Sequence, residues 1–146
     1  MSVSEQNKVV VRRVIEEVYN QGDLAAIEEY VASDFVIHSP SEEIHGPDGV
    51  KQYVAALRDS FPDLHLTIED QIAEGDRVAT RWTARGTHTG AFQGIPPTGK
   101  RGSMTGIAID RFANGKVVEC WVNGDDLGLL QQLGVIPTPE MAGAAP

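Results

Sequence analysis

The sequence predicts an α+β domain, in which a strongly curved, mostly antiparallel sheet forms a cone-shaped barrel with about three N-terminal helices packed on it and a short C-terminal helix. Two observations predict this class. Apolar residues recur at helical spacing before Phe61, and from His65 onward their spacing changes towards two. Helices followed by antiparallel strands favour this class over a doubly wound parallel sheet, and the space between the two layers suits a small molecule.

The first segments are predicted to be two helices and a short strand. Apolar residues over 11–18 lie on one helical face, and Ser2 with Glu5 has the spacing of a capping box. Asp23 can cap a second helix, whose inward residues would extend to Val31. The β-branched segment "DFVIHS" then predicts a strand.

A third helix and a first hairpin follow. Pro47 suits the first turn of a helix, and the apolar face from Val50 to Phe61 is continuous. Residues 65–88 then alternate around the turn "EGD", which predicts a hairpin. In its register Asp70 lies opposite Arg81, a favourable pair of opposite charges.

The second hairpin is predicted from Asn114-Gly115, a strong signal for a two-residue turn. Counting from this turn places Asp110 opposite Glu119, Ala108 opposite Trp121 and Gly106 opposite Asn123. One face then carries Glu119, Trp121, Asn123 and Asp125, and the other carries Val118, Cys120 and Val122. The polar face is either a pocket wall or a solvent face, and the pattern alone leaves both open. Asp126 is predicted to cap the last helix.

Composition narrows the choice of partners. The chain of 146 residues has a formal charge of −9, which disfavours nucleic acid and anionic membranes as partners. The single cysteine, Cys120, excludes an internal disulfide and suits a cytoplasmic protein. We expect a single domain over residues 1–137 and a flexible tail over residues 138–146.

The segment "GIPPTGKR", residues 94–101, fits the G-x-x-x-x-G-K pattern of a phosphate-binding loop. Pro96 and Pro97 have no N–H to offer a phosphate, and Arg101 lacks the hydroxyl that holds magnesium. The residues that follow predict a strand rather than a helix. We therefore predict a turn-rich connection between two strands.

Four segments, in order, resemble the SnoaL-like polyketide (ester) cyclase family: "NQGDLAAIEEYVASDFVIHSP", "SFPDLH", "RGTHTGAFQGIPPTGK" and "VVECWVNGDDLGLLQQLGV". This resemblance implies the NTF2-like fold and a homodimer through the outer face of the sheet. It also implies aldol-type ring closure on an apolar or aromatic carbonyl substrate without metal or cofactor. The cyclases carry their acid–base aspartate on the last strand, and the resemblance places it at Asp125. The alternative is that Asp125 caps the last helix.

Position on the predicted strands gives further candidates for substrate binding: Asn123, His88, His38, Trp121 and Trp82. Each also has a structural interpretation. A histidine can hydrogen-bond a turn or lie in the core, and large aromatic residues often belong to the core. The chain departs from the cyclases at Met104, Gly106 and Ala108, where the cyclases carry polar residues.

Three functional hypotheses follow. The first, which we favour, is a cofactor-independent cyclase or related lyase or isomerase. The second is another reaction of this fold, such as hydrolysis, isomerisation or hydroxylation; for hydrolysis, Asp70 and Arg81 could supply part of the water-positioning site if they faced the pocket. The third is a non-catalytic binding or dimerisation module, because fold does not determine reaction.

Overall fold

The computed structural model describes residues 1–139. Its helices and strands are, in order, α1 Val3–Arg13, η1 Val14–Asn20, η2 Leu24–Ala26, α2 Ile27–Tyr30, β1 Val31–His38, β2 Glu43–His45, α3 Gly46–Ser60, β3 His65–Glu74, β4 Arg77–Thr87, β5 Arg101–Ala113, β6 Lys116–Gly124 and α4 Asp126–Gln132. The predicted tail, 138–146, lies for the most part outside the described residues. Within that described part, no helix is both long and apolar enough to cross a membrane.

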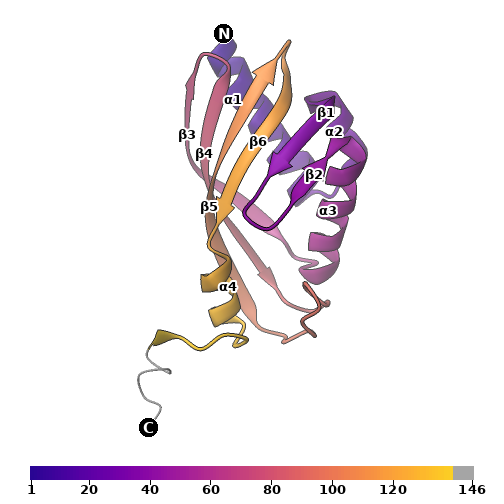
Figure 1. Cartoon of the computed structure of the whole chain (residues 1–146), viewed down its shortest axis with the longest axis vertical. Coiled ribbons are helices and arrows are strands. Elements are labelled where there is room, and N and C mark those ends of the chain that lie inside the picture. The colour runs from indigo at the N-terminus through magenta and orange to yellow at the C-terminus, as the bar shows by residue number, and fades with distance from the viewer. Residues whose placement is uncertain (140–146) are drawn as a thin grey trace.

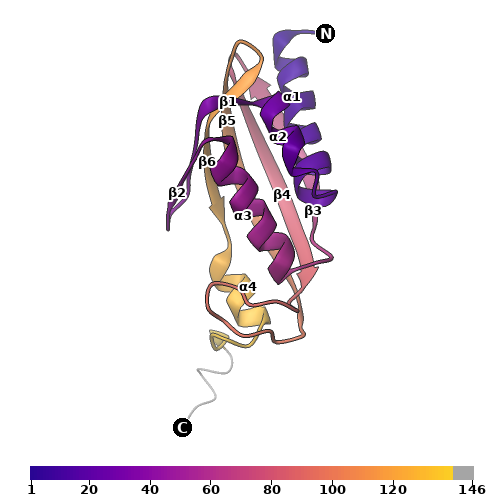
Figure 2. The ribbon, with the colours of Figure 1, turned by 90° about the vertical axis from the view of Figure 1, so that its right-hand side faces the viewer.

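A single sheet of six strands organises the molecule, in the order β2-β1-β6-β5-β4-β3. Neighbouring strands are antiparallel except β1 and β6, which are parallel. The sheet curves strongly but stays open, and α1 and α3 lie on the same side of it (Figures 1 and 2). The predicted α+β class is therefore confirmed, with the core between helices and sheet.

The N-terminal helices begin as predicted but end differently. Ser2 caps α1, and its Oγ accepts the Glu5 N–H at 3.1 Å. Helical structure continues through η1, a π-helical segment. Asp23 occupies the N-cap position of η2, but its side chain makes no capping hydrogen bond. Val31 begins β1 instead of extending the second helix, because it pairs with Val117 of β6.

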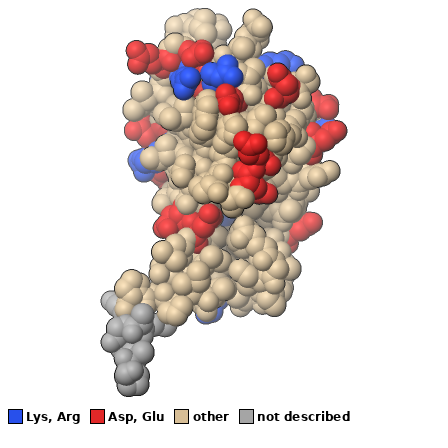
Figure 3. Space-filling model, viewed as in Figure 1, with Lys and Arg blue, Asp and Glu red and all other residues tan. Residues whose placement is uncertain are grey.

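The third helix and the first hairpin follow the prediction. Pro47 lies in the first turn of α3, and β3 pairs with β4 so that Asp70 lies opposite Arg81. Both side chains are exposed and no ion pair joins them. The acidic excess of the chain is visible as scattered carboxylates on the face shown in Figure 3.

The second hairpin turns at Asn114-Gly115 as predicted, but its register differs beyond the turn. Ala113 faces Lys116, and then the register shifts by one residue between Arg111 and Phe112. Val118 is the extra residue of this β-bulge, because Phe112 pairs with Val117 and Arg111 with Glu119. The predicted pairs Asp110–Glu119, Ala108–Trp121 and Gly106–Asn123 are therefore wrong; the observed pairs are Asp110–Cys120, Ala108–Val122 and Gly106–Gly124.

Candidate functional site

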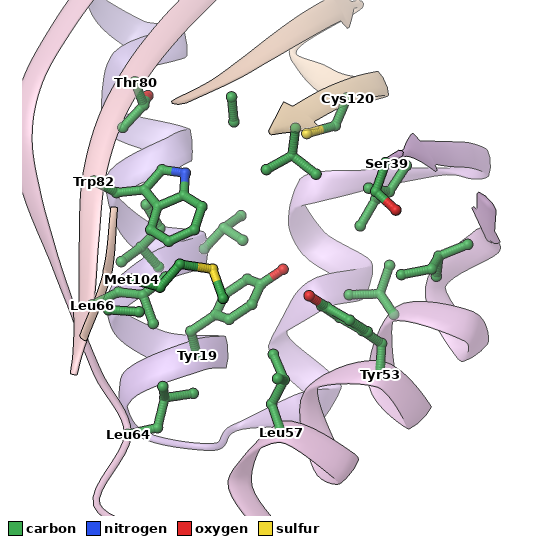
Figure 4. Close-up of a pocket in the computed structure, with 18 of the residues that line it drawn as sticks. Tyr19, Ser39, Tyr53, Leu57, Leu64, Leu66, Thr80, Trp82, Met104 and Cys120 are labelled. Atoms are coloured by element: carbon green, nitrogen blue, oxygen red, sulfur yellow. The ribbon is translucent and has the colours of Figure 1, made fainter. Parts of the chain in front are cut away.

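A cavity of about 200 Å³ lies between the helices and the inner face of the sheet. Its walls are mainly aliphatic and aromatic side chains (Figure 4). Polar side chains on the wall are few, and those with a titratable or hydroxyl group near its interior include Tyr19, Tyr53, Asp110 and Cys120. An apolar cavity with a few polar groups is the usual form of a small-molecule site.

Trp82 forms one wall of this cavity because two glycines leave room for its ring. Trp82 of β4 pairs with Gly106 of β5, and Gly106 pairs with Gly124 of β6. A Cβ atom at Gly106 would overlap the six-membered ring of Trp82, and one at Gly124 would lie 2.8 Å from Met104 Sδ. The indole therefore occupies the space over the neighbouring strand. Trp82, a predicted substrate-binding residue, lines the cavity, and its role in binding stays a prediction.

Asp110 is the one carboxylate among the described lining residues of the cavity. The bulge in β6 pairs it with Cys120, so both side chains lie on the inner face. Burial in these apolar surroundings raises the pKa of Asp110 to about 7, while a side-chain hydrogen bond with Cys120 lowers it. Burial likewise raises the pKa of the Cys120 thiol, with the Asp110 charge adding to the effect. A carboxyl group with a pKa near neutrality can both take up and return a proton.

Asp125, the predicted catalytic residue, does not line the cavity. It is exposed at the N-cap of α4, where its Oδ1 accepts the Gly128 N–H at 2.9 Å. Asp126 is the first residue of that helix, so the cap prediction for Asp126 is wrong by one residue. The position of Asp125 matches the alternative stated for it, a helix cap, and its catalytic role stays a prediction.

Three further candidates, His38, Trp121 and Asn123, do not line the cavity. Cys120 and Val122 of β6 do, so by alternation Trp121 and Asn123 lie on the opposite face of the sheet, and His38 of β1, which pairs with Trp121, lies there too. His38 Nδ1 lies 2.6 Å from Glu43 and Nε2 lies 2.7 Å from Glu119, and its ring stacks on Trp121 at 5.7 Å. Hydrogen bonds with Glu119 and Glu43 raise the pKa of His38. This group is a polar cluster on β1, β2 and β6, and of the two alternatives left open for the polar face of β6, the pocket wall is the wrong one, because Cys120 and Val122 line the cavity instead.

His88 is completely buried beside the cavity lining rather than at the mouth of the pocket. Its Nδ1 accepts the Thr98 N–H at 3.2 Å and lies 3.0 Å from Thr98 Oγ1, which fastens the loop between β4 and β5. Phe61 and Phe92 surround the ring, and Nε2 has no hydrogen-bond partner among residues 1–139. This loop contains "GIPPTGK", and it connects two strands as predicted.

Asp110, Tyr19, Tyr53 and Cys120 line the cavity, although none of them was predicted to be a site residue. One signal was present for Asp110, a single charge within the otherwise apolar run "GIAID". Asp70 and Arg81, considered for a hydrolytic site, do not line the cavity. In the described part of the chain no group of three or more His, Cys, Asp or Glu side chains could hold a metal ion.

Comparison with known proteins finds relatives that are similar over most of this chain. The model of the SnoaL-like polyketide cyclase family matches residues 9–133. Aklanonic acid methyl ester cyclase DnrD of Streptomyces peucetius is 31% identical over 138 residues, covering 90% of this chain and 93% of that protein. Two solved structures are similar over most of their length. AclR of Streptomyces galilaeus, a candidate hydroxylase, has a TM-score of 0.82 and 35% identity, covering 92% of this chain and 85% of that one. IdmH of Streptomyces antibioticus, a candidate polyketide cyclase, has a TM-score of 0.78 and 36% identity, covering 89% and 99%.

Proposed function

Because the chain belongs to the SnoaL-like polyketide cyclase family, we propose that it closes a ring within a polyketide-like carbonyl compound, with Asp110 as the acid–base residue. The chain has the NTF2-like α+β fold of that family. The observation that carries the proposal is the position of Asp110, a carboxylate in the wall of an apolar cavity with a pKa near 7.

The reaction that this arrangement supports is an intramolecular aldol addition. The Asp110 carboxylate removes a proton from the carbon next to one carbonyl, which leaves an enolate. The enolate carbon attacks a second carbonyl of the same molecule, forming the ring C–C bond and an alkoxide. Asp110, now protonated, returns the proton to that alkoxide. Nothing is gained or lost, so the product is an isomer of the substrate.

The apolar wall suits a neutral substrate. Among the described lining residues the one cationic side chain is Arg85, and that residue is exposed. A substrate carboxylate would therefore lose its hydration without a buried cation to replace it, a costly exchange. An ester of the kind named for the relative DnrD carries no such charge.

We expect the purified protein to convert an aromatic polyketide methyl ester into a product of unchanged mass. Its kcat/KM should rise as the pH increases through about 7 and then level, because the base must be deprotonated and the pKa of Asp110 is raised to about 7. Chromatography with mass spectrometry over a pH series measures both features. A flat profile across pH 5 to 9, or a product of different mass, would count against this mechanism.

We also propose a homodimer through the outer face of the sheet. Ile72, Ile107 and Ile109 are 67%, 54% and 39% exposed there. Exposed patches of large apolar side chains are typical of protein–protein interfaces. The wild-type protein should elute with the mass of a dimer in light-scattering chromatography, and Ile107→Asp should elute as a monomer. A monomeric wild type would refute this assembly.

A further inference from the structure

The hydroxyl groups of Tyr19 and Tyr53 enter the cavity from two different helices. Tyr19 belongs to η1 and Tyr53 to α3, and both line the cavity. Figure 4 shows the two hydroxyls pointing towards one another across the cavity, and the two groups also interact electrostatically. They lie on the helical side of the cavity, whereas Asp110 comes from the sheet.

Neither hydroxyl has a hydrogen-bond partner among residues 1–139. Both residues are partly buried, and both line the cavity. Tyrosine hydroxyls inside proteins normally find a partner. The third tyrosine follows this rule, since the Tyr30 hydroxyl donates to Glu17 Oε2 at 2.6 Å. Two unpaired phenols in one apolar cavity are therefore available to a bound molecule.

We propose that Tyr19 and Tyr53 together form a two-donor site for the oxygen of the substrate that becomes negatively charged during ring closure. This assignment rests on the proposed function, because it concerns the same cavity and the same enolate. Both O–H groups would donate to the carbonyl oxygen of the substrate. Hydrogen bonds to a charged oxygen are stronger than those to a neutral one, so the pair would favour the enolate over the ground state.

The electrostatics of the cavity support donors rather than anions at these positions. Burial raises the pKa of Tyr53 to about 12 and raises that of Tyr19 as well, so both phenols keep their protons at neutral pH. The negative charge of Asp110 adds to the effect at Tyr19. During ring closure that charge moves from Asp110 to the substrate oxygen, so the cavity holds one negative charge throughout. The tyrosines lose no proton in this scheme.

The test measures binding and needs no turnover. 2,4-Dinitrophenolate imitates the enolate oxygen, and 2,4-dinitroanisole has nearly the same shape without the charge. At about pH 5.5 Asp110, with a pKa of about 7, is protonated and does not repel the anion. We expect Tyr19→Phe and Tyr53→Phe each to raise the Kd of the phenolate about tenfold or more, and to change the Kd of the anisole less than about twofold.

Tyr30→Phe is the matched control, because its hydroxyl pairs with Glu17 and its residue does not line the cavity. It should leave both Kd values unchanged. Equal losses for the two probes, no loss for the phenolate, or the same loss in Tyr30→Phe would each overturn the proposal.

The same variants separate this proposal from the proposed function. If the Tyr→Phe variants bind phenolate normally while Asp110→Asn abolishes ring closure, the two-donor site fails and the cyclase mechanism stands. If they lose phenolate binding selectively while Asp110→Asn closes the ring at the wild-type rate, the donor site stands and Asp110 is not the acid–base residue.

Discussion

Replacing Asp110 by asparagine is expected to lower kcat for ring closure by about 10²- to 10⁴-fold, the contribution typical of one positioned acid–base group. Asparagine has nearly the same shape but cannot accept the substrate proton. Since it keeps a polar group in the cavity wall, we expect KM to change much less than kcat. Initial rates with an aromatic polyketide methyl ester measure both constants.

Asp125→Asn is the matched control for this change. An amide oxygen can still accept the Gly128 N–H that Asp125 now accepts, and the residue is exposed, so kcat should remain within about twofold of the wild-type value. A large loss of kcat in Asp125→Asn, with wild-type rates in Asp110→Asn, would restore Asp125 as the acid–base residue.

The stability of Asp110→Asn separates catalysis from folding. Burial raises the pKa of Asp110 from 3.8 to about 7, so the wild-type protein loses stability as the pH rises across that interval. The neutral amide has no such loss. Urea unfolding should therefore find the variant stabilised relative to the wild type at pH above about 7, with the difference shrinking as the pH falls towards 4. An inactive variant that is also less stable at every pH would indicate a structural role instead.

Replacing Gly106 by alanine is expected to displace the Trp82 ring from its position in the cavity wall. The new methyl group would overlap the Trp82 ring, so the indole must move away from the sheet and into the cavity. Overpacking of this kind costs about 1–3 kcal/mol of unfolding free energy. We expect a lower urea midpoint together with about a tenfold or greater loss in the affinity for dinitroanisole, measured by fluorescence titration.

The double variant Trp82→Leu with Gly106→Ala tests the cause of that loss. Leucine leaves room for the methyl group, so the double variant should recover most of the stability lost by Gly106→Ala alone. Purely additive effects of the two changes would show that the glycine acts through the backbone and not through the indole.

The fold was predicted correctly where a local sequence pattern determines the structure. The capping residue Ser2, the first-turn Pro47 and the Asn114-Gly115 turn each act within a few residues, and the structure has all three in place. The bulge at Val118 did not have such a signal. It arises because Phe112 and Val117 are buried together in the core, a contact between strands that spacing along one strand cannot reveal.

The site was harder to predict than the fold for the same reason. One extra residue in β6 moved Asp110 from beside Glu119 to beside Cys120, and the apolar face of β6 became the cavity wall. The resemblance to the family indicated a cyclase but placed the aspartate at a helix cap. Tyr19 and Tyr53 look like ordinary core residues in the sequence, because only the arrangement of the helices shows that their hydroxyls share one space.

Substrate fit and acid–base chemistry depend on different rows of the sheet, so evolution can change one of them without the other. Gly106 lies four residues from Asp110 along β5, roughly 13 Å at the rise of a β-strand. Exchanging the large and small residues in the row Trp82–Gly106–Gly124 would change which molecules fit, while the row Val78–Asp110–Cys120, which carries the proposed acid–base residue, stayed as it is. Proteins with this arrangement can therefore come to accept different substrates while the same residue carries out the reaction.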